Sequence, residues 1–121
     1  MLKENPIVDK SFDFGLLIIR LCKYMTQTQQ EYILSKQLLR CGTSIGANVS
    51  EAQYAQSKAD FYTKMRIALK ETNETIYWLR LLFHSGHLDE TRFQTAHHAA
   101  NELLRLLTAI CKTSEQRKQA F

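Results

Sequence analysis

The chain has 121 residues, of which 45% are hydrophobic and 23% charged, a composition typical of one globular domain rather than of a disordered or fibrous protein. One proline and four glycines are too few for the many turns of a β-rich fold, so we expect a few long elements. The net charge of +4, from 16 lysines and arginines against 12 acidic residues, permits nucleic acid or another anionic partner without requiring one.

The first predicted element is a helix over about residues 7–28. Its apolar residues recur at helical spacing in two rows, one of Phe12, Leu16 and Ile19 and the other of Phe14, Leu17, Leu21 and Met25, with Ile18 beside it. Together the rows cover a wider arc than one core-facing stripe needs. Because exposed apolar rows mark interfaces, we expect one row to pack against another copy of the chain.

The second predicted helix covers about residues 31–52. Its apolar residues are separated by steps of four and three, which is the helical signature: Leu34, Leu38, Cys41, Ile45, Val49 and Ala52. The same segment contains two glycines, two serines and a threonine in the stretch "RCGTSIGANVSEA", which raises the question of a phosphate-binding loop.

That loop is excluded by the spacing. It needs four residues between its glycines and then Gly-Lys-Ser/Thr, whereas Gly42 and Gly46 have three residues between them and Ala47 follows. On a helix, Gly42, Gly46 and Ser50 lie four apart on one side and let a neighbouring backbone come near. We call these three residues the small-residue stripe, and we expect it to pack closely against a helix, either inside the bundle or between subunits.

A polar row lies along another side of the second helix. Its members step by three or four residues: Gln37, Arg40, Ser44, Asn48 and Glu51. The third helix offers Lys70, Glu71 and Glu74, with Trp78 one turn beyond. Acids and bases on facing helices predict an interhelical network that sets register and partner choice; a polar cleft that receives a ligand is the functional alternative.

The third and fourth helices are predicted over about residues 57–85 and 90–113. Met65, Leu69 and Thr72 begin the apolar rhythm of the third, and Phe93 and Ala96 that of the fourth. "SKAD" is a capping-box variant, Gly86 is placed to end the third helix, and Asp89 to cap the fourth. The fold class is therefore an antiparallel up-and-down four-helix bundle, a single domain over 1–121 with a polar, frayed C-terminal tail.

Metal and catalytic chemistry find little support in the sequence. Cys22, Cys41 and Cys111 are odd in number and far apart in apolar contexts, which fits buried thiols and neither disulfides nor zinc. His84, His87, His97 and His98 form no Glu-x-x-His pair and are expected to face solvent. We expect no metal, no cofactor and no enzyme activity. Without a signal peptide or an apolar run of roughly 20 residues, a cytoplasmic protein with no membrane contact is expected.

Six basic residues are candidates for nucleic-acid binding: Lys36, Arg40, Lys58, Lys64, Arg66 and Lys70. Tyr54 and Tyr62 could stack on unpaired bases. A solvated surface neutralised by Asp60, Glu71 and Glu74 is the alternative. A protein-interaction scaffold that does not touch nucleic acid is the second functional candidate, and it predicts a much weaker dependence of binding on salt.

Two stretches carry a resemblance to a known family. "QLLRCGTSIGANVSEA" and "SKADFYTKMRIALKETNETIYWLRLL" resemble the four-helix-bundle proteins encoded in intervening sequences of bacterial 23S rRNA genes, over nearly the whole chain. Cys41 stands where we would expect serine, a departure that leaves the small-residue stripe intact.

The resemblance implies an up-and-down bundle that forms a ring-like homo-oligomer, a pentamer. It also implies a relation to the accessory protein of diversity-generating retroelements, which is similar to a basic barrel that works with a reverse transcriptase and nucleic acid. The family carries no established biochemical activity, and its genomic setting connects it with RNA by association.

Overall fold

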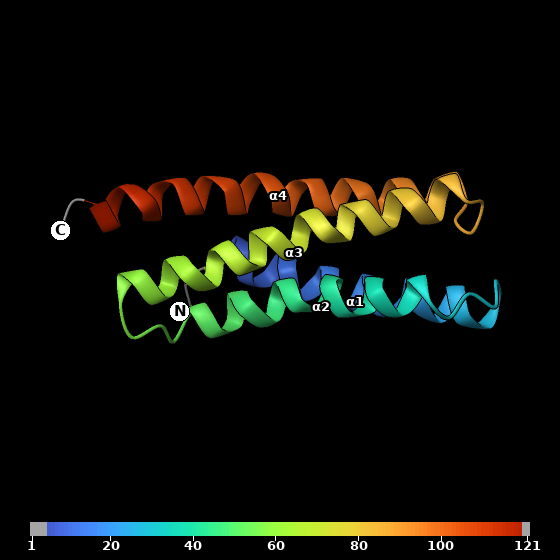
Figure 1. The fold of residues 1–121 in the computed structure, drawn as a ribbon, viewed down its shortest axis with the longest axis horizontal. Helices are drawn as coiled ribbons and strands as arrows, with labels where there is room; N and C mark the ends of the chain where they lie inside the picture. Colours follow the sequence, from blue (N-terminus) through green and yellow to red (C-terminus); the bar gives the residue numbers. More distant parts are fainter. Residues whose placement is uncertain (1–4, 120–121) are drawn as a thin grey trace.

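The computed structural model describes residues 5–119, with side chains over 5–116. Four helices make up the fold (Figure 1): α1 (Pro6–Gln27), α2 (Leu34–Ala52), α3 (Lys58–His84) and α4 (Glu90–Gln119). They run up and down along one long axis and are joined by short connections, the arrangement expected of long helices with few turn residues. The structure thus confirms the predicted all-α up-and-down bundle.

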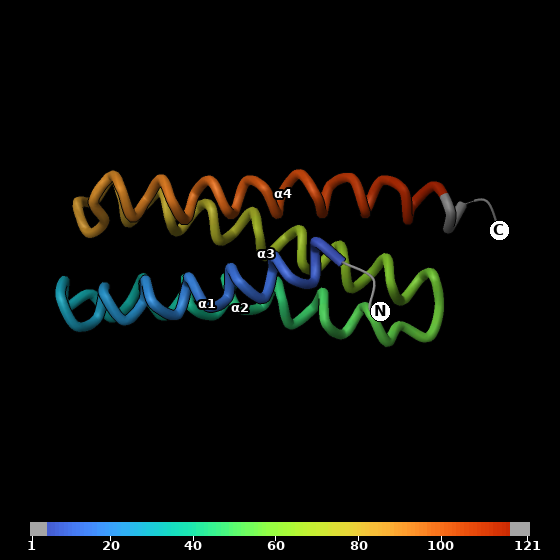
Figure 2. Tube along the Cα trace, turned by 180° about the vertical axis from the view of Figure 1, so that it is seen from behind, coloured from blue at the N-terminus to red at the C-terminus, as the bar shows by residue number. Residues whose placement is uncertain are grey.

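The four helices pack in the order in which they follow one another in the chain. α2 lies between α1 and α3, and α4 closes the bundle against α3 and α1, while no described Cα atom of α1 comes within 8 Å of one in α3. Figures 1 and 2 show α3 crossing the bundle obliquely, from the end of α2 to the start of α4. Surfaces on α1 and α3 therefore belong to different sides of the molecule.

The core contains the helix faces that the apolar spacing indicates. On α1, Phe14, Ile18 and Met25 are buried, and the other helices contribute Leu38, Ile45, Val49, Met65, Leu79, Phe93, Leu103 and Leu107. The other apolar row of α1, which contains Phe12, Leu16 and Ile19, stays at the surface. Phe12 is 66% exposed and Leu16 is 39% exposed. One bundle core therefore does not hide all the apolar surface of α1.

Ser57 fixes the start of α3. Its hydroxyl accepts a hydrogen bond from the Asp60 N–H at 3.0 Å, and the Asp60 carboxylate accepts one from the Gln56 N–H at 3.3 Å. This reciprocal pair is a capping-box variant in which the carboxylate reaches one residue further back than usual.

Gly86 and Asp89 form the turn between α3 and α4. Gly86 adopts a φ of 85°, a left-handed conformation that glycine enters without strain. The His87 N–H then donates to the Leu82 carbonyl at 2.9 Å, the long bond of a Schellman motif. Asp89 caps α4 by accepting from the Arg92 N–H at 3.3 Å.

The second helix begins at Leu34, later than the predicted start near residue 31. The Glu31 carboxylate folds onto the helix end and accepts hydrogen bonds from the N–H groups of Ile33 (3.2 Å), Leu34 (3.1 Å) and Ser35 (2.8 Å). Burial works against ionisation of Glu31, but these three donors outweigh it and lower the pKa of the carboxyl. Glu31 is therefore a cap of α2 rather than its first residue.

The fourth helix extends past the predicted end at residue 113 to Gln119. Residues 112–119 contain lysine, arginine, glutamate and glutamine and neither glycine nor proline. These side chains are good helix formers, so polarity alone does not end the helix there.

Candidate functional surfaces

Arg40 of α2 reaches across the bundle surface to two glutamates of α3. Its Nη2 donates to Glu74 Oε1 at 2.5 Å, and its Nη1 lies 3.6 Å from Glu71 Oε2. Trp78 Nε1 donates to the same Glu74 oxygen at 3.4 Å, and Gln37 Oε1 accepts from Arg40 at 3.4 Å. Because the Arg40 side chain is half exposed, the cluster contributes more to the register of α2 on α3 than to stability.

The rest of the polar row does not join this cluster. Asn48 donates to the Ser44 carbonyl at 2.9 Å, a bond within α2. Glu51, near the end of α2, pairs with Lys64 of α3 at 3.4 Å. The polar row thus contains the ion-pair cluster of Arg40 at one end and the Glu51–Lys64 ion pair at the other. Between them lies the hydrogen bond of Asn48 within α2.

The two glutamates of the cluster differ in their electrostatics. Burial raises the pKa of Glu71, and the negative charge of Glu74 raises it further, against the pull of Arg40. Glu71 Oε2 is buried and has no hydrogen-bond partner among the described residues, since 3.6 Å is too long for Arg40 to donate. Burial also acts on Glu74, but the donors Arg40 and Trp78 outweigh it and lower its pKa.

We expect Glu71→Gln and Glu74→Gln to have opposite effects at neutral pH. A carboxyl whose pKa is raised by folding destabilises the protein once it ionises, so Glu71→Gln should preserve or increase the free energy of unfolding. Glu74→Gln removes a charge-assisted bond and should lower it by about 0.5–1 kcal/mol. Urea unfolding of both variants is the measurement.

The pH dependence gives a second readout of the same pair. The contribution of Glu74 is present above its ordinary pKa of 4.5 and disappears as the pH falls through the lowered value of the folded state. The difference between wild type and Glu74→Gln should therefore shrink in acid. A greater loss of stability for Glu71→Gln than for Glu74→Gln at neutral pH would contradict this assignment.

The small-residue stripe brings α2 close to α1 inside the bundle. A Cβ added at Gly42 would lie 2.9 Å from two carbons of Ile18, and one at Gly46 would lie 3.1 Å from the Ser11 carbonyl oxygen. Both distances are shorter than ordinary carbon contacts. Ser50, one turn further along, is exposed, so the close contact is made by the two glycines.

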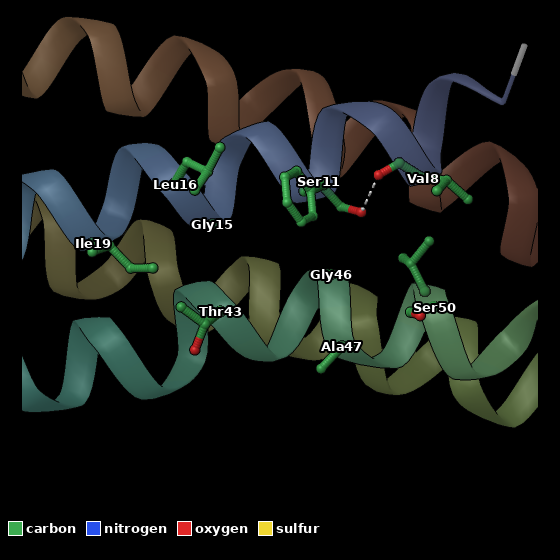
Figure 3. A pocket seen from close by; sticks show the side chains of 11 residues that line it. Val8, Ser11, Gly15, Leu16, Ile19, Thr43, Gly46, Ala47 and Ser50 are labelled. Carbon is green, nitrogen blue, oxygen red and sulfur yellow. Dashed lines mark hydrogen bonds between the residues drawn. The ribbon is translucent and has the colours of Figure 1, made fainter.

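A groove runs along the outer side of this contact (Figure 3). It has a volume of about 360 Å³, and we call it the apolar groove; it is lined by Val8, Ser11, Phe12, Gly15, Leu16 and Ile19 of α1 and by Thr43, Gly46, Ala47, Val49 and Ser50 of α2. Most of these side chains are apolar or small, and no charged residue is among them. The exposed row of α1 forms one wall, and the small residues of α2 form the other.

The six candidate basic residues fall into groups with different surroundings. Arg40 and Lys64 are engaged with glutamates. Lys36 is exposed on α2, and Lys58 is exposed at the first position of α3. The remaining two, Arg66 and Lys70, are exposed one turn apart on α3, and neither forms an ion pair with a described residue.

Arg66 and Lys70 share a second groove on the outer surface of α3. It has a volume of about 570 Å³, and we call it the basic groove; its lining residues are Tyr62, Thr63, Arg66, Ile67, Leu69, Lys70 and Asn73. Asn73 is not among the candidates predicted from the sequence, although it continues the helical spacing of Tyr62, Arg66 and Lys70, with steps of four, four and three residues. Tyr54, by contrast, lies 86% exposed in the turn after α2 and outside this groove.

Cysteines and histidines have separate surroundings. All three cysteines are free and buried, and burial is the main reason that the pKa of Cys22 is raised to about 12. His97 is half-buried and stacks on Phe93, with 4.8 Å between ring centroids, so it does not face solvent fully as expected. Among the described residues, no three histidines, cysteines or acids are grouped to hold a metal ion.

Within the described part of the chain, none of the four helices has the length and apolar character needed to cross a membrane.

Fold and surface together define a small four-helix-bundle protein whose first two helices meet through glycines and whose third carries the basic groove. The chain belongs to the 23S rRNA-intervening sequence protein family, whose model matches residues 3–109. No curated protein matches it.

A solved structure shares the fold of this chain. The chain is similar to a protein of unknown function from the S23 ribosomal protein family of Bacteroides thetaiotaomicron, with 45% sequence identity and a TM-score of 0.86. The similarity covers 88% of this chain and 98% of that chain, so it extends over most of the bundle.

Proposed function

We propose that the chain is a non-enzymatic, homo-oligomeric module that binds nucleic acid, with RNA favoured over DNA. The observation that carries the proposal is the basic groove, where Arg66 and Lys70 are exposed and have no carboxylate partner among the described residues. Phosphates supply the negative charge that this surface lacks. The association of the family with rRNA intervening sequences favours RNA.

Assembly would strengthen a site that carries few charges. Several copies of the basic groove in one particle bind a long strand with an avidity far above the affinity of each copy. Two separate apolar surfaces support such assembly: the exposed row of α1, and Tyr77 and Leu81 on α3. Because α1 and α3 lie on different sides of the bundle, a head-to-tail contact between these surfaces forms a ring when its rotation closes. The ring that we propose is a pentamer, as the resemblance to the intervening-sequence family implies.

The apolar groove favours a second candidate, a scaffold that recruits another protein. A partner helix packed there would be held mainly by apolar contact and would be nearly indifferent to salt. Nucleic-acid binding predicts the opposite, because each phosphate contact on a single strand adds a slope of roughly −0.7 to log K against log salt.

The test is a titration of a labelled fragment of 23S rRNA with the full chain at several salt concentrations, after light scattering has given the mass of the particle. We expect a steep salt slope that falls in Arg66→Gln/Lys70→Gln by roughly 0.7 for each contact removed. Arg105→Gln, which removes an exposed charge of α4 outside the groove, is the matched control. An unchanged slope in the double variant would move the site elsewhere, and no binding at all would favour the scaffold.

A further inference from the structure

The basic groove combines three kinds of side chain along one helix. Tyr62, Arg66 and Lys70 are spaced by one helical turn each and therefore follow one another along the outer surface of α3. Asn73 continues the line, and Ile67 and Leu69 add apolar walls. The volume of about 570 Å³ lies in the range of small-molecule pockets, ~300–1,000 Å³, so the groove has room for a nucleotide as well as for phosphate oxygens.

Tyr62 is held in place before any ligand arrives. It is half-buried and packs against the core cluster while it also lines the groove. A ring held by packing has lost most of its freedom already, so stacking on it costs less conformational entropy than stacking on a mobile side chain. This separates Tyr62 from Tyr54, which is almost fully exposed in a turn.

Asn73 supplies hydrogen-bonding groups of both kinds at the end of the line. Its Nδ2 donates to the Leu69 carbonyl at 3.4 Å, and this bond leaves Oδ1 and a second N–H for a ligand. An amide with a donor and an acceptor can pair with the edge of a base. A phosphate, which offers only acceptors, would use the N–H alone.

From these features we propose that the basic groove binds unpaired nucleotides, with one base stacked on Tyr62, the edge of another base at Asn73, about 16 Å further along the helix, and the phosphates between them at Arg66 and Lys70. This inference rests on the proposed nucleic-acid function and specifies its ligand. A duplex offers phosphates but keeps the faces of its bases stacked inside. Tyr62, Ile67 and Leu69 would then contribute nothing, whereas a single strand uses the aromatic, apolar and cationic parts of the groove together.

The experiment compares a short labelled RNA strand with the duplex of the same sequence, by fluorescence anisotropy with the full chain. We expect the single strand to bind roughly tenfold more tightly, the scale of stacking one base on an aromatic ring. Tyr62→Leu should lose roughly this factor for the single strand and little for the duplex, and Tyr62→Phe should bind like the wild type. Tyr32→Leu, the same change at an exposed tyrosine in the connection before α2 and outside the groove, is the matched control.

Each outcome has a defined meaning. If Tyr62→Leu fails to fold, as a circular dichroism melt would show, Asn73→Ala replaces it, because Asn73 is exposed and its loss should weaken binding of the single strand selectively. Equal affinity for strand and duplex overturns the inference while leaving nucleic-acid binding intact. The inference is also overturned if Tyr62→Leu and Asn73→Ala both fold and both bind the single strand with wild-type affinity. No binding of either probe overturns the proposed function together with the inference.

Discussion

Gly42→Ala is expected to lower the free energy of unfolding by about 1–3 kcal/mol, the usual effect of overpacking a core. Alanine is the better helix former by about 1 kcal/mol, so propensity alone predicts the opposite sign. The new methyl group would lie 2.9 Å from two carbons of Ile18, a branched side chain that is fully buried. Either Ile18 leaves its rotamer or α1 and α2 separate.

Gly46→Leu extends the test along the same contact. Its Cβ would meet the Ser11 carbonyl oxygen at 3.1 Å, and backbone cannot rotate away as a side chain can. The larger leucine should therefore lower stability by more than Gly42→Ala does. Urea unfolding followed by circular dichroism measures both variants.

Gly15→Ala is the matched control for this pair. Gly15 also lies in mid-helix, but an added Cβ would have no neighbour within 4 Å. Stability should rise there by about 0.5–1 kcal/mol. A rise at Gly42 as well would show that α1 and α2 are not in close contact at that point.

The sequence predicted the small-residue stripe but not its partner. Steps of four between Gly42, Gly46 and Ser50 follow from helix geometry alone, whereas the choice between a contact inside the bundle and one between subunits depends on how α1 is rotated. The structure places Gly42 and Gly46 against α1 and leaves Ser50 in the wall of the apolar groove. The small-residue stripe therefore packs against α1 through its two glycines and reaches the surface at Ser50.

Some helix boundaries can be predicted from local sequence signals alone, and others cannot. Ser57 and Gly86 are typical of helix ends because a short hydroxyl and a residue without Cβ suit those positions, and the structure uses both. Glu31 is a good helix former, so the sequence predicted it inside α2. Its role as a cap depends on a side chain that folds back onto three N–H groups, which spacing does not reveal.

The basic residues could not be ranked from the sequence. Arg40 and Arg66 have the same charge and occupy similar helical positions, yet Arg40 meets Glu74 of a neighbouring helix and Arg66 meets no carboxylate among the described residues. That distinction arises from the pairing of α2 with α3. The sequence shows the helical spacing of Tyr62, Arg66 and Lys70, but only the structure shows that the three residues line one groove.

Phe12→Glu is expected to have the largest effect on the mass of the particle, because it should convert the proposed oligomer into single chains. Phe12 is 66% exposed and lines the apolar groove, so a carboxylate there is tolerated in the monomer but strongly disfavoured in an apolar contact with a second copy. Monomer stability should change by less than about 0.5 kcal/mol. Light scattering should give several times the mass of one chain for wild type and the mass of one chain for the variant.

The control for Phe12→Glu is Tyr54→Glu, which places the same charge on another exposed aromatic residue, in the turn after α2 and 86% exposed. If assembly uses the apolar groove, Tyr54→Glu keeps the wild-type mass. If both variants keep it, the interface lies elsewhere on the bundle, and Leu81→Glu on the outer apolar surface of α3 tests the other half of the head-to-tail contact. A wild-type protein with the mass of one chain would contradict assembly itself, and the basic groove would then have to bind nucleic acid without avidity.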